Sequence, residues 1–505
     1  MGAIAALMSK DGSDVCGQIG SMLRLLEHRG RDWVRVSISG QIRGGRSVDE
    51  ADCSDLRGST ALAEAHLKRY EGEGDPNYPE GLFTAVDGRL YGLKRFEMGL
   101  GFPFHLGVPE AEIFGRIVVQ NLGVGLVAAV QKALSELDGV YAVAAAENGR
   151  MVFGRDPLGV KSLYYGENET LFGLASERKA LWDVGIWEAH SFPPGTVGEL
   201  VQDGMRFHPF SVISKPEIES LTLEDASVRL EGALRLSFAK RLTSVGEVAL
   251  SFSGGVDSSV AARMIADSGC GVLLCVVGLE GCHDIVVAED SAKALGINIE
   301  VRPLRIDEVV DYVRKVVYAV EESDLMKIGV GLPLYVASET VGRRGFGFIF
   351  SGQGSDELFC GYNKYMTVLD RMGYEGLEEE MWRDVTRMYE VNLQRDDAVT
   401  AANGVRLEVP FMDLDLVKTA AAFPVSLNVT SPDDPLRKRV LRRMAERIGL
   451  PRRIVDMPKK SAQYGSGIDS AMRSIARAGG FRSVREYLNS VFREVFQRRF
   501  VQEPH

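Results

Sequence analysis

A loop rich in glycine and serine in the middle of the chain is the segment best suited to chemistry. Residues 248–263 read VALSFSGGVDSSVAAR, which predicts an apolar strand, a loop and the first turns of a helix. Paired glycines let the backbone approach an anion closely, and the amides at a helix N-terminus favour a bound phosphate. Serine hydroxyls add donors, and a carboxylate can hold a Mg²⁺ that neutralises phosphate charge. The residues predicted to bind the nucleotide or its metal are Ser253, Gly254, Gly255, Asp257, Ser258 and Ser259.

The order of residues in this loop separates it from the Walker loop, which ends in Gly-Lys followed by Ser or Thr. It resembles instead the pyrophosphate-binding loop of enzymes that split ATP between the α and β phosphates and leave AMP on the substrate. A plain Gly-Gly turn between a strand and a helix is the alternative. The match of seven residues, from Ser253 to Ser259, in a strand–loop–helix context favours the phosphate site over that turn.

A second glycine-rich loop follows another apolar segment. Residues 351–362 read SGQGSDELFCGY, and the two loops together closely resemble the asparagine synthetase family of the B type. The resemblance implies that the second loop faces the nucleotide and that Asp356 joins Asp257 in holding Mg²⁺, because one carboxylate cannot orient a metal that bridges two phosphates. An acidic turn after a strand is the alternative. The other nucleotide contacts implied in this loop are Ser351, Gly352 and Gly354.

Two lysines further along the chain also keep the family's order. Lys438 stands where the family has a lysine followed by a Leu-Arg pair. In the segment PKKSAQYGSG, Lys459 matches the family's catalytic lysine, which also occurs in the related β-lactam synthetases. A cation there stabilises the tetrahedral intermediate and the departing AMP phosphate. Lys460 is the competing assignment, and a solvated helix face is the alternative for each basic segment taken alone.

The same half of the chain departs from its relatives at three places. In GVRLEVPFMD, Arg406 and Glu408 carry charges exchanged relative to the family stretch. Gln353, a candidate catalytic residue, stands where active bacterial relatives have a Glu assigned to the substrate or its attacking amine. Residues 321–333, EESDLMKIGVGLP, lack the Thr- and Arg-rich pattern of those relatives. These changes leave ATP use intact and leave the acceptor acid open.

Segments near the N-terminus resemble the glutaminase domain of the same family, which has an N-terminal-nucleophile fold. They include residues 1–6, 28–30 and 155–165. An active member begins Met-Cys-Gly, and after Met removal the thiolate attacks the glutamine amide with its own α-amino group as base. Here position 2 is Gly2, and Cys16 cannot substitute because the mechanism needs a chain-terminal amine beside the thiol.

Two further segments of that domain are altered. The family's substrate-binding Asn-Gly-Glu reads Asp87-Gly88-Arg89, and its Ser-Asp-x-Glu segment reads PEAE, with Glu110 and Glu112. Several such changes together indicate that this domain does not hydrolyse glutamine. The resemblance is therefore to a degenerate class II glutamine amidotransferase domain.

Apolar patterning predicts how these segments are arranged. Short alternating runs such as YAVAAA and MVFGRD, with many Gly turns, predict a β-rich domain over residues 1–208, which the resemblance makes a layered αββα fold. The strand-like runs EVALSFS, GVLLCVVGL and FGFIFSG alternate with helical segments over residues 215–505, which predicts an α/β domain with a parallel sheet. The stretch HPFSVISKPEIES is the predicted linker.

Composition excludes several classes of function. The chain of 505 residues has a formal charge of −11, which argues against nucleic acid as a partner, and it has no apolar stretch long enough for a membrane span. We expect a cytoplasmic protein. Its six cysteines form no C-x-x-C pair, so buried reduced thiols are favoured over a metal site at Cys270, Cys275 and Cys282.

The resemblance predicts an ATP-dependent carbon–nitrogen ligase. It would adenylate a carboxylate, most simply that of aspartate, with Mg-ATP, and convert it to an amide with ammonia, releasing AMP and pyrophosphate. Three alternatives stay open: a ligase for another acid or amine, including ring closure; a non-catalytic nucleotide-binding regulator; and an enzyme fed by a separate glutaminase subunit. The sequence leaves a homodimer open as well.

Overall fold

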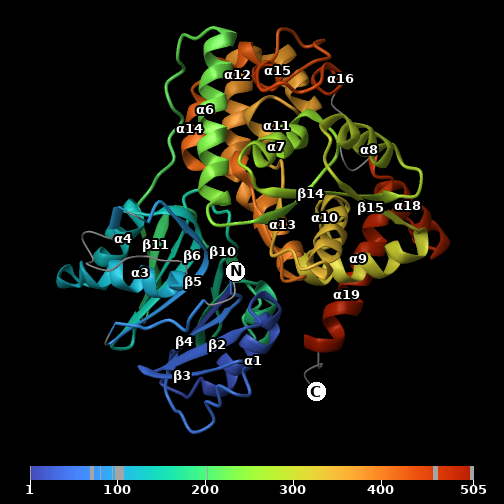
Figure 1. The fold of residues 1–505 in the computed structure, drawn as a ribbon. Helices are drawn as coiled ribbons and strands as arrows, with labels where there is room; N and C mark the ends of the chain where they lie inside the picture. Colours follow the sequence, from blue (N-terminus) through green and yellow to red (C-terminus); the bar gives the residue numbers. More distant parts are fainter. Residues whose placement is uncertain are drawn as a thin grey trace. The chain divides into compact units, whose positions relative to one another are not determined.

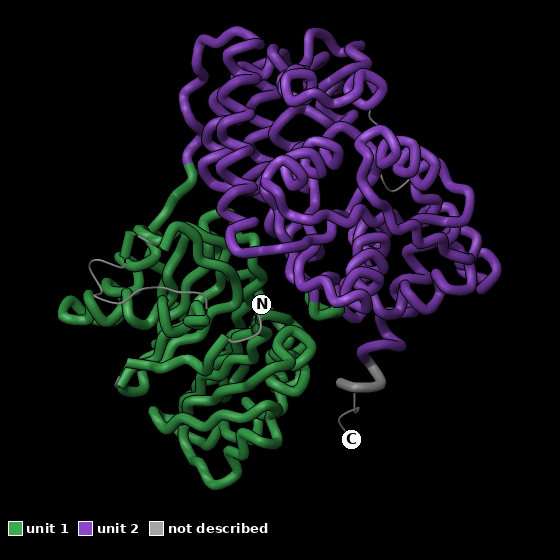
Figure 2. Tube along the Cα trace, viewed as in Figure 1, with its two compact units in different colours: residues 1–213, 401–404 green, residues 214–400, 405–505 purple. Residues whose placement is uncertain are grey.

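The computed structural model describes residues 2–68, 73–79, 81–93, 95–96, 107–201, 203–458 and 465–500, of which 497–500 are described for the backbone alone. The chain forms two compact units (Figure 2). Unit 1 comprises Met1–Ile213 with Ala401–Gly404, and unit 2 comprises Ser214–Thr400 with Val405–His505.

Unit 1 contains two antiparallel sheets. The seven-stranded sheet has the order β10-β8-β9-β1-β4-β2-β3, and the five-stranded sheet has the order β12-β11-β7-β6-β5. The strands are β1 (Gly2–Ser9), β2 (Trp33–Ile38), β3 (Gln41–Gly45), β4 (Thr60–His66), β5 (Leu82–Tyr91), β6 (Asp138–Glu147), β7 (Arg150–Arg155), β8 (Tyr164–Glu167), β9 (Leu171–Ala175), β10 (His190–Ser191), β11 (Thr196–Val201) and β12 (Gly204–Pro209). The helices are α1 (Cys16–Leu26), α3 (Glu110–Val119), α4 (Leu126–Glu136) and α5 (Arg178–Asp183).

The two sheets stack between two helical layers (Figure 1). Strand β1 shows the cause, because successive side chains of a strand point to opposite faces. Ala3, Ala5 and Leu7 pack with α1 and α5, whereas Ile4 and Ala6 pack against the second sheet. Helices α3 and α4 cover the outer face of that second sheet. Unit 1 therefore has the predicted αββα layers.

Unit 2 is built around one parallel sheet. Its order is β15-β14-β13-β16-β17, and every neighbouring pair is parallel. These strands are β13 (Glu247–Ser251), β14 (Gly271–Leu279), β15 (Ile299–Leu304), β16 (Phe348–Phe350) and β17 (Arg406–Glu408). The helices are α6 (Leu223–Leu242), α7 (Val256–Asp267), α8 (His283–Leu295), α9 (Ile306–Val320), α10 (Leu325–Arg343), α11 (Ser355–Leu358), α12 (Asn363–Met388), α13 (Gln394–Ala401), α14 (Leu414–Ala421), α15 (Arg439–Arg447), α16 (Arg452–Val455), α18 (Ile468–Ala478) and α19 (Val484–Phe500).

Helices cover both faces of this sheet, with α7 and α8 on one side and α10 on the other (Figure 1). The central strand accordingly buries both of its faces: Val248, Ala249 and Leu250 are fully enclosed. Such a continuous apolar run is typical of a parallel strand. The predicted α/β parallel-sheet domain is confirmed, with the three predicted strands present as β13, β14 and β16.

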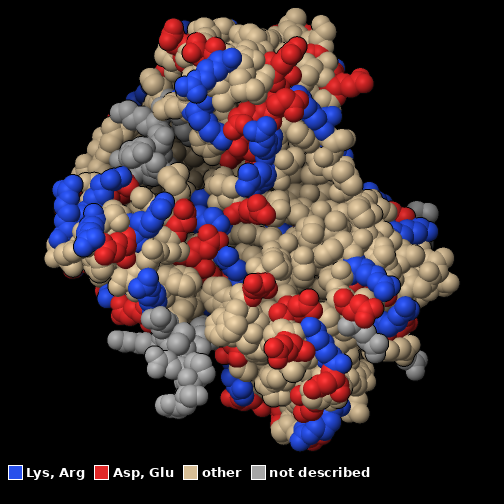
Figure 3. Space-filling model, turned by 180° about the vertical axis from the view of Figure 1, so that it is seen from behind, with Lys and Arg blue, Asp and Glu red and all other residues tan. Residues whose placement is uncertain are grey.

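The surface and the thiols are consistent with ordinary globular units. On the face drawn in Figure 3, the described acidic and basic side chains are interspersed, and they form no continuous basic surface there. Among the described residues no helix is long and apolar enough to cross a membrane. All six cysteines are free thiols, and burial raises the pKa of Cys275 to about 12. Of the predicted buried thiols, Cys270 and Cys282 are only partly enclosed.

Candidate active site in the second unit

The two glycine-rich loops lie side by side because the strands that precede them are neighbours. Strand β13 pairs in parallel with β16, so both loops leave the same edge of the sheet. The first loop leads into α7 and the second into α11. The carboxyl edge of a parallel sheet is where such folds bind ligands.

Glycine is required in the first loop for space and for conformation. Gly254 has φ +76°, and a Cβ atom there would lie 2.7 Å from the carbonyl oxygen of Val287. The Ser291 hydroxyl donates to the Gly254 carbonyl at 2.9 Å and holds the turn from α8. The Ser253 hydroxyl is 3.3 Å from that of Ser258, which lies in the first turn of α7. The loop thus presents hydroxyls and helix amides together, as phosphate binding requires.

Two carboxylates and one lysine form the centre of the site. The Lys438 ammonium lies 2.6 Å from Asp257 Oδ2 and 2.6 Å from Asp356 Oδ1. The Ser355 hydroxyl donates to Asp257 Oδ1 at 2.9 Å and lies 3.2 Å from Lys438 Nζ. Both carboxylates therefore converge on one cation, although about 100 and 80 residues separate the three segments along the chain. Among the described residues, no group of three or more His, Cys, Asp and Glu side chains could hold a metal. The acidic groups that a metal could use at this site are therefore the two carboxylates.

The backbone of Lys438 has an uncommon conformation. Lys438 has φ +64° and ψ +37° as the residue that precedes α15, and its side chain is fully buried. The Cys360–Gly361 segment packs directly over the ion pairs: a Cβ atom on Gly361 would collide with both the Asp356 carboxylate and the Lys438 side chain. A non-glycine residue with positive φ is strained, so the ion pairs must stabilise it.

A buried carboxyl behind the pair was not recognised from the sequence. Glu357 Oε1 accepts hydrogen bonds from the Tyr362 hydroxyl at 2.7 Å and from Asn392 Nδ2 at 3.0 Å. Burial, with the neighbouring charge of Asp356, raises the pKa of Glu357 to about 7. The acidic run of the second loop is thus divided, with Asp356 facing the lysine and Glu357 enclosed. The two acids, Asp356 and Glu357, are distinguished by what surrounds each side chain along α11.

The remaining predicted residues of the second loop either contact the first loop or shape the turn. A Cβ atom on Gly352 would lie 3.4 Å from Asp257 Cβ, so the two loops touch there. Gly354 has φ +99°, which Gly adopts without strain. The Gln353 amide donates to the Ser351 hydroxyl at 3.3 Å, and the side chain of Gln353 is partly exposed. Lys459 and Lys460 lie outside the described residues.

The exchanged charges on β17 are both buried, and Glu408 forms an ion pair with Arg241. Arg241 lies 3.5 Å from Glu408 and 3.0 Å from Asp413. Burial lowers the pKa of Arg406 to about 10, and the charge of Glu408, two residues along the same strand, partly opposes that shift. The guanidinium of Arg406 also lies over the ring of Phe348 at 5.2 Å.

In unit 1, the end of β1 that would carry a nucleophile is enclosed by charged side chains. The Gly2 amide donates to Asp87 Oδ1 at 3.0 Å, and Arg29 donates to Asp87 Oδ2 at 2.8 Å and to the Gly2 carbonyl at 3.0 Å. Arg29 also pairs with Glu177 at 3.0 Å. Burial acts against ionisation of Glu177, but the charges of His28 and its other cationic neighbours hold the pKa of this carboxyl well below its ordinary value.

There is no room for a side chain at position 2. A Cβ atom on Gly2 would lie 2.7 Å from the carbonyl oxygen of Ala65 on the neighbouring strand. Two of the altered side chains in this domain make contacts of their own. The Arg89 guanidinium lies over the Tyr91 ring at 5.6 Å, and Glu112 accepts a hydrogen bond from the Asn77 amide at 2.8 Å. The sequence predicted the loss of the thiol. The structure adds that the backbone of Ala65 occupies the space that a side chain at position 2 would need.

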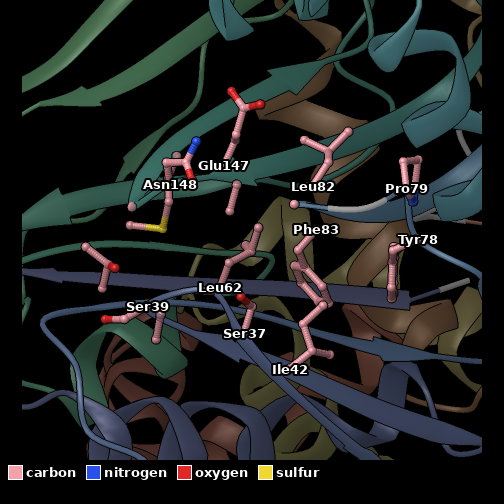
Figure 4. A pocket seen from close by; sticks show the side chains of 17 residues that line it. Ser37, Ser39, Ile42, Leu62, Tyr78, Pro79, Leu82, Phe83, Glu147 and Asn148 are labelled. Atoms are coloured by element: carbon pink, nitrogen blue, oxygen red, sulfur yellow. The ribbon is translucent and has the colours of Figure 1, made fainter.

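A cavity of about 190 Å³ in unit 1 lies elsewhere (Figure 4). Its walls include Ser37, Leu62, Phe83 and Asn148, from both sheets. It borders Thr60, which pairs with Met8 at the far end of β1, whereas Gly2 pairs with His66. This cavity is therefore not the position of the missing nucleophile.

Comparison with known proteins identifies the chain as an ATP-dependent ligase that carries a glutamine amidotransferase-type unit. The asparagine synthase family model matches residues 229–374 and 369–504, and the glutamine amidotransferase domain model matches residues 116–183. The chain belongs to the asparagine synthetase family.

Relatives match along most of the chain. A Methanocaldococcus jannaschii protein, provisionally named asparagine synthetase (glutamine-hydrolyzing) 1, is 31% identical, with 98% of this chain and 99% of that protein covered. The Brassica oleracea asparagine synthetase (glutamine-hydrolyzing) is 26% identical over 88% of this chain and 74% of that protein. Among solved structures, the glutamine phosphoribosylpyrophosphate amidotransferase from B. subtilis matches at 17% identity and a TM-score of 0.37, covering 59% of this chain and 65% of that chain.

Proposed function

We propose that unit 2 adenylates a carboxylic acid, most simply the side chain of aspartate, and then converts it to an amide. In the first step a carboxylate oxygen of the substrate attacks the α-phosphorus of ATP, and the bond to the β-phosphate oxygen breaks to release pyrophosphate. In the second step an amine nitrogen attacks the acyl carbon, loses a proton, and displaces AMP. Activation is needed because a carboxylate is a poor electrophile and AMP is a good leaving group.

The observation that supports this proposal is the convergence of Asp257, Asp356 and Lys438 beside the glycine-rich loop. The two carboxylates fit a Mg²⁺ ion, because Mg²⁺ is held by hard oxygen ligands and takes one or two carboxylates together with substrate phosphates. When bound, the ion would neutralise charge that develops on the β and γ phosphates. Lys438 keeps the carboxylates on one side of the site, and the loop amides and hydroxyls orient the phosphates.

The amine in this proposal is free ammonia, or another amine, and does not come from glutamine hydrolysed in unit 1. Gly2 supplies no thiol, its amide is bonded to Asp87, and Ala65 blocks the space of a side chain. A covalent glutamyl intermediate needs a nucleophile at this position. Unit 1 is then a structural remnant of an amidotransferase domain.

The acceptor acid is the open part of the proposal, and one observation favours a second candidate. At the start of α10, where active relatives are rich in Thr and Arg, Met326 is 56% exposed and Lys327 pairs with Glu322 at 2.8 Å. No arginine stands in residues 321–333 to hold an acidic substrate. A larger or less acidic acceptor, including one that closes a ring on its own amine, fits this segment as well as aspartate does.

The experiment measures pyrophosphate release from ATP across a panel of amino acids, each with ammonium, with glutamine, and with neither nitrogen source. We expect release with one class of acid, and amide formation with ammonium but not with glutamine. Asp257→Asn and Asp356→Asn should each abolish release while circular dichroism stays unchanged. Turnover at the wild-type rate in either variant would remove that carboxylate from the mechanism. Glutamate release from glutamine would contradict the role given to unit 1.

A further inference from the structure

Arg437 is a buried cation without a partner. Its side chain is 7% exposed, and among the described residues it makes no hydrogen bond, ion pair or ring contact. Its Nε atom is completely enclosed and unbonded. A buried charge without compensation is costly, and natural proteins pair such groups or use them for ligands. The side chain therefore requires an explanation.

The acids around Arg437 are committed elsewhere. Asp434 accepts from the Thr430 amide at 3.0 Å and from the Leu436 amide at 2.9 Å. Asp257 and Asp356 both pair with Lys438, the residue that follows Arg437. Among the described residues, no carboxylate forms an ion pair or a hydrogen bond with the Arg437 guanidinium. The guanidinium is therefore open to the negative charge of a bound molecule.

Arg437 directly precedes Lys438, whose ammonium lies 2.6 Å from each of the two carboxylates. In agreement with this position, burial raises the pKa of the Cys360 thiol to about 12 and the positive charge of Arg437 partly opposes that. The segment that contains Cys360 covers the Asp356–Lys438 ion pair. Both Asp257 and Arg437 also act electrostatically on Arg442. Arg437 therefore borders the same site from the side of α15.

The helix end itself is not free to bind an anion. The first amides of α15 are already satisfied, because Arg439 donates to the Asn428 carbonyl at 3.2 Å and Val440 donates to the Asn428 side chain at 3.4 Å. Arg442 is likewise engaged, since it donates to the Arg437 carbonyl at 2.7 Å and to the Met457 carbonyl at 2.9 Å. Of the cations described on this segment, Lys438 is held between carboxylates. Arg439 is partly exposed, so Arg437 is the enclosed cation of this segment that has no partner among the described residues.

We propose that Arg437 binds the β and γ phosphates of ATP and retains them as the departing pyrophosphate. This rests on the proposed function, in which pyrophosphate leaves beside Asp257 and Asp356. An arginine suits that ligand, because its planar set of donors matches a phosphate group with two hydrogen bonds. Arg437 is a binding residue that neutralises the leaving group, next to the two carboxylates that would hold its metal.

The test uses inorganic pyrophosphate with Mg²⁺ as the probe and the full chain as the protein. Calorimetry measures its dissociation constant, and thermal unfolding measures the stabilisation it produces, for the wild type, Arg437→Met, Arg437→Lys and the control Arg443→Gln. Arg443 lies on the same helix but pairs at the surface with Glu224 at 2.7 Å. Loss of one charge-assisted contact should weaken pyrophosphate binding about 10- to 100-fold in Arg437→Met.

The stability of the ligand-free protein separates a binding role from a structural one. If the role of Arg437 is to bind an anion, ligand-free Arg437→Met should unfold at the same temperature as the ligand-free wild type or at a higher one. Pyrophosphate should then raise the unfolding temperature of the variant less than that of the wild type. Arg437→Lys should bind with intermediate affinity, and Arg443→Gln should bind as the wild type does. A lower unfolding temperature of Arg437→Met with unchanged pyrophosphate affinity overturns the proposal. A wild type that binds no pyrophosphate overturns the proposed function itself.

Discussion

Replacing Lys438 by Met should make the stability of unit 2 depend on Mg²⁺. The lysine contacts both carboxylates at 2.6 Å and is itself 1% exposed, whereas Asp257 and Asp356 are 15% and 19% exposed. Breaking a buried ion pair typically costs about 3–5 kcal/mol. Because water reaches both carboxylates, we expect the lower end of that range, about 3 kcal/mol. That corresponds to a fall of about 5 °C in the unfolding temperature of a unit of this size.

A divalent cation should restore much of this loss, since it can take the place of the ammonium between the carboxylates. At a concentration about 100 times its dissociation constant, a ligand stabilises the folded state by about 2.7 kcal/mol. The assay is thermal unfolding of wild type and variant in EDTA and in Mg²⁺. The matched control is Lys364→Met, a lysine that also bridges two carboxylates, at 3.3 and 2.6 Å, but is 48% exposed. It should lose at most about 1 kcal/mol, with no effect of Mg²⁺.

Two results would refute this reasoning. If Lys438→Met unfolds in EDTA at the wild-type temperature, the lysine does not hold the carboxylates together. If the loss is large but Mg²⁺ restores none of it, the pair does not form a metal site. Calcium in place of Mg²⁺ gives a further comparison, because Ca²⁺ prefers more oxygen ligands than two carboxylates provide.

Three further predictions follow from single residues. Gly2→Cys should show no glutaminase activity and a lower unfolding temperature, since a Cβ atom would lie 2.7 Å from a backbone oxygen; glutamate release above a heat-killed control would contradict this. Lys459→Ala should retain pyrophosphate exchange but lose about 10²–10³ in amide formation, whereas Lys460→Ala should be milder; the reverse order would shift the assignment by one residue. The raised pKa of Glu357, about 7, means that the folded state holds its proton more tightly than the unfolded state, so stability should fall between about pH 4.5 and 7 and stay level above. Glu357→Gln should abolish that fall in urea titrations, and an unchanged pH profile would show that another group causes it.

Local signals in the sequence predicted the elements that carry the site. The strand–loop–helix pattern around Ser253 is contiguous, and so is the second loop from Ser351, so strand, turn and helix start could each be recognised from neighbouring residues. Alternation in YAVAAA and MVFGRD predicted β6 and β7 in the same way. The loss of the nucleophile at Gly2 needed no structure, because glycine has no side chain.

In contrast, the burial and the partners of a side chain could not be predicted from its residue type. Asp356 and Glu357 are adjacent acids, yet one faces Lys438 and the other is enclosed with Tyr362. Arg437 and Lys438 are adjacent bases, and among the described residues only Lys438 forms ion pairs. Glu357 and Arg437 could not be singled out from the sequence for this reason, since the only available signal was a charged residue beside a predicted site residue.

The sequence by itself determined the order of elements, the two glycine-rich loops and the absence of a thiol at position 2, because each depends on residues that are neighbours in the chain. The tertiary structure decided which distant side chains meet. It joined Asp257, Asp356 and Lys438 through the parallel pairing of β13 and β16 and the course of the chain into α15. The physical reason is that pairing and burial are set by the whole fold, which brings together charges that no local pattern connects.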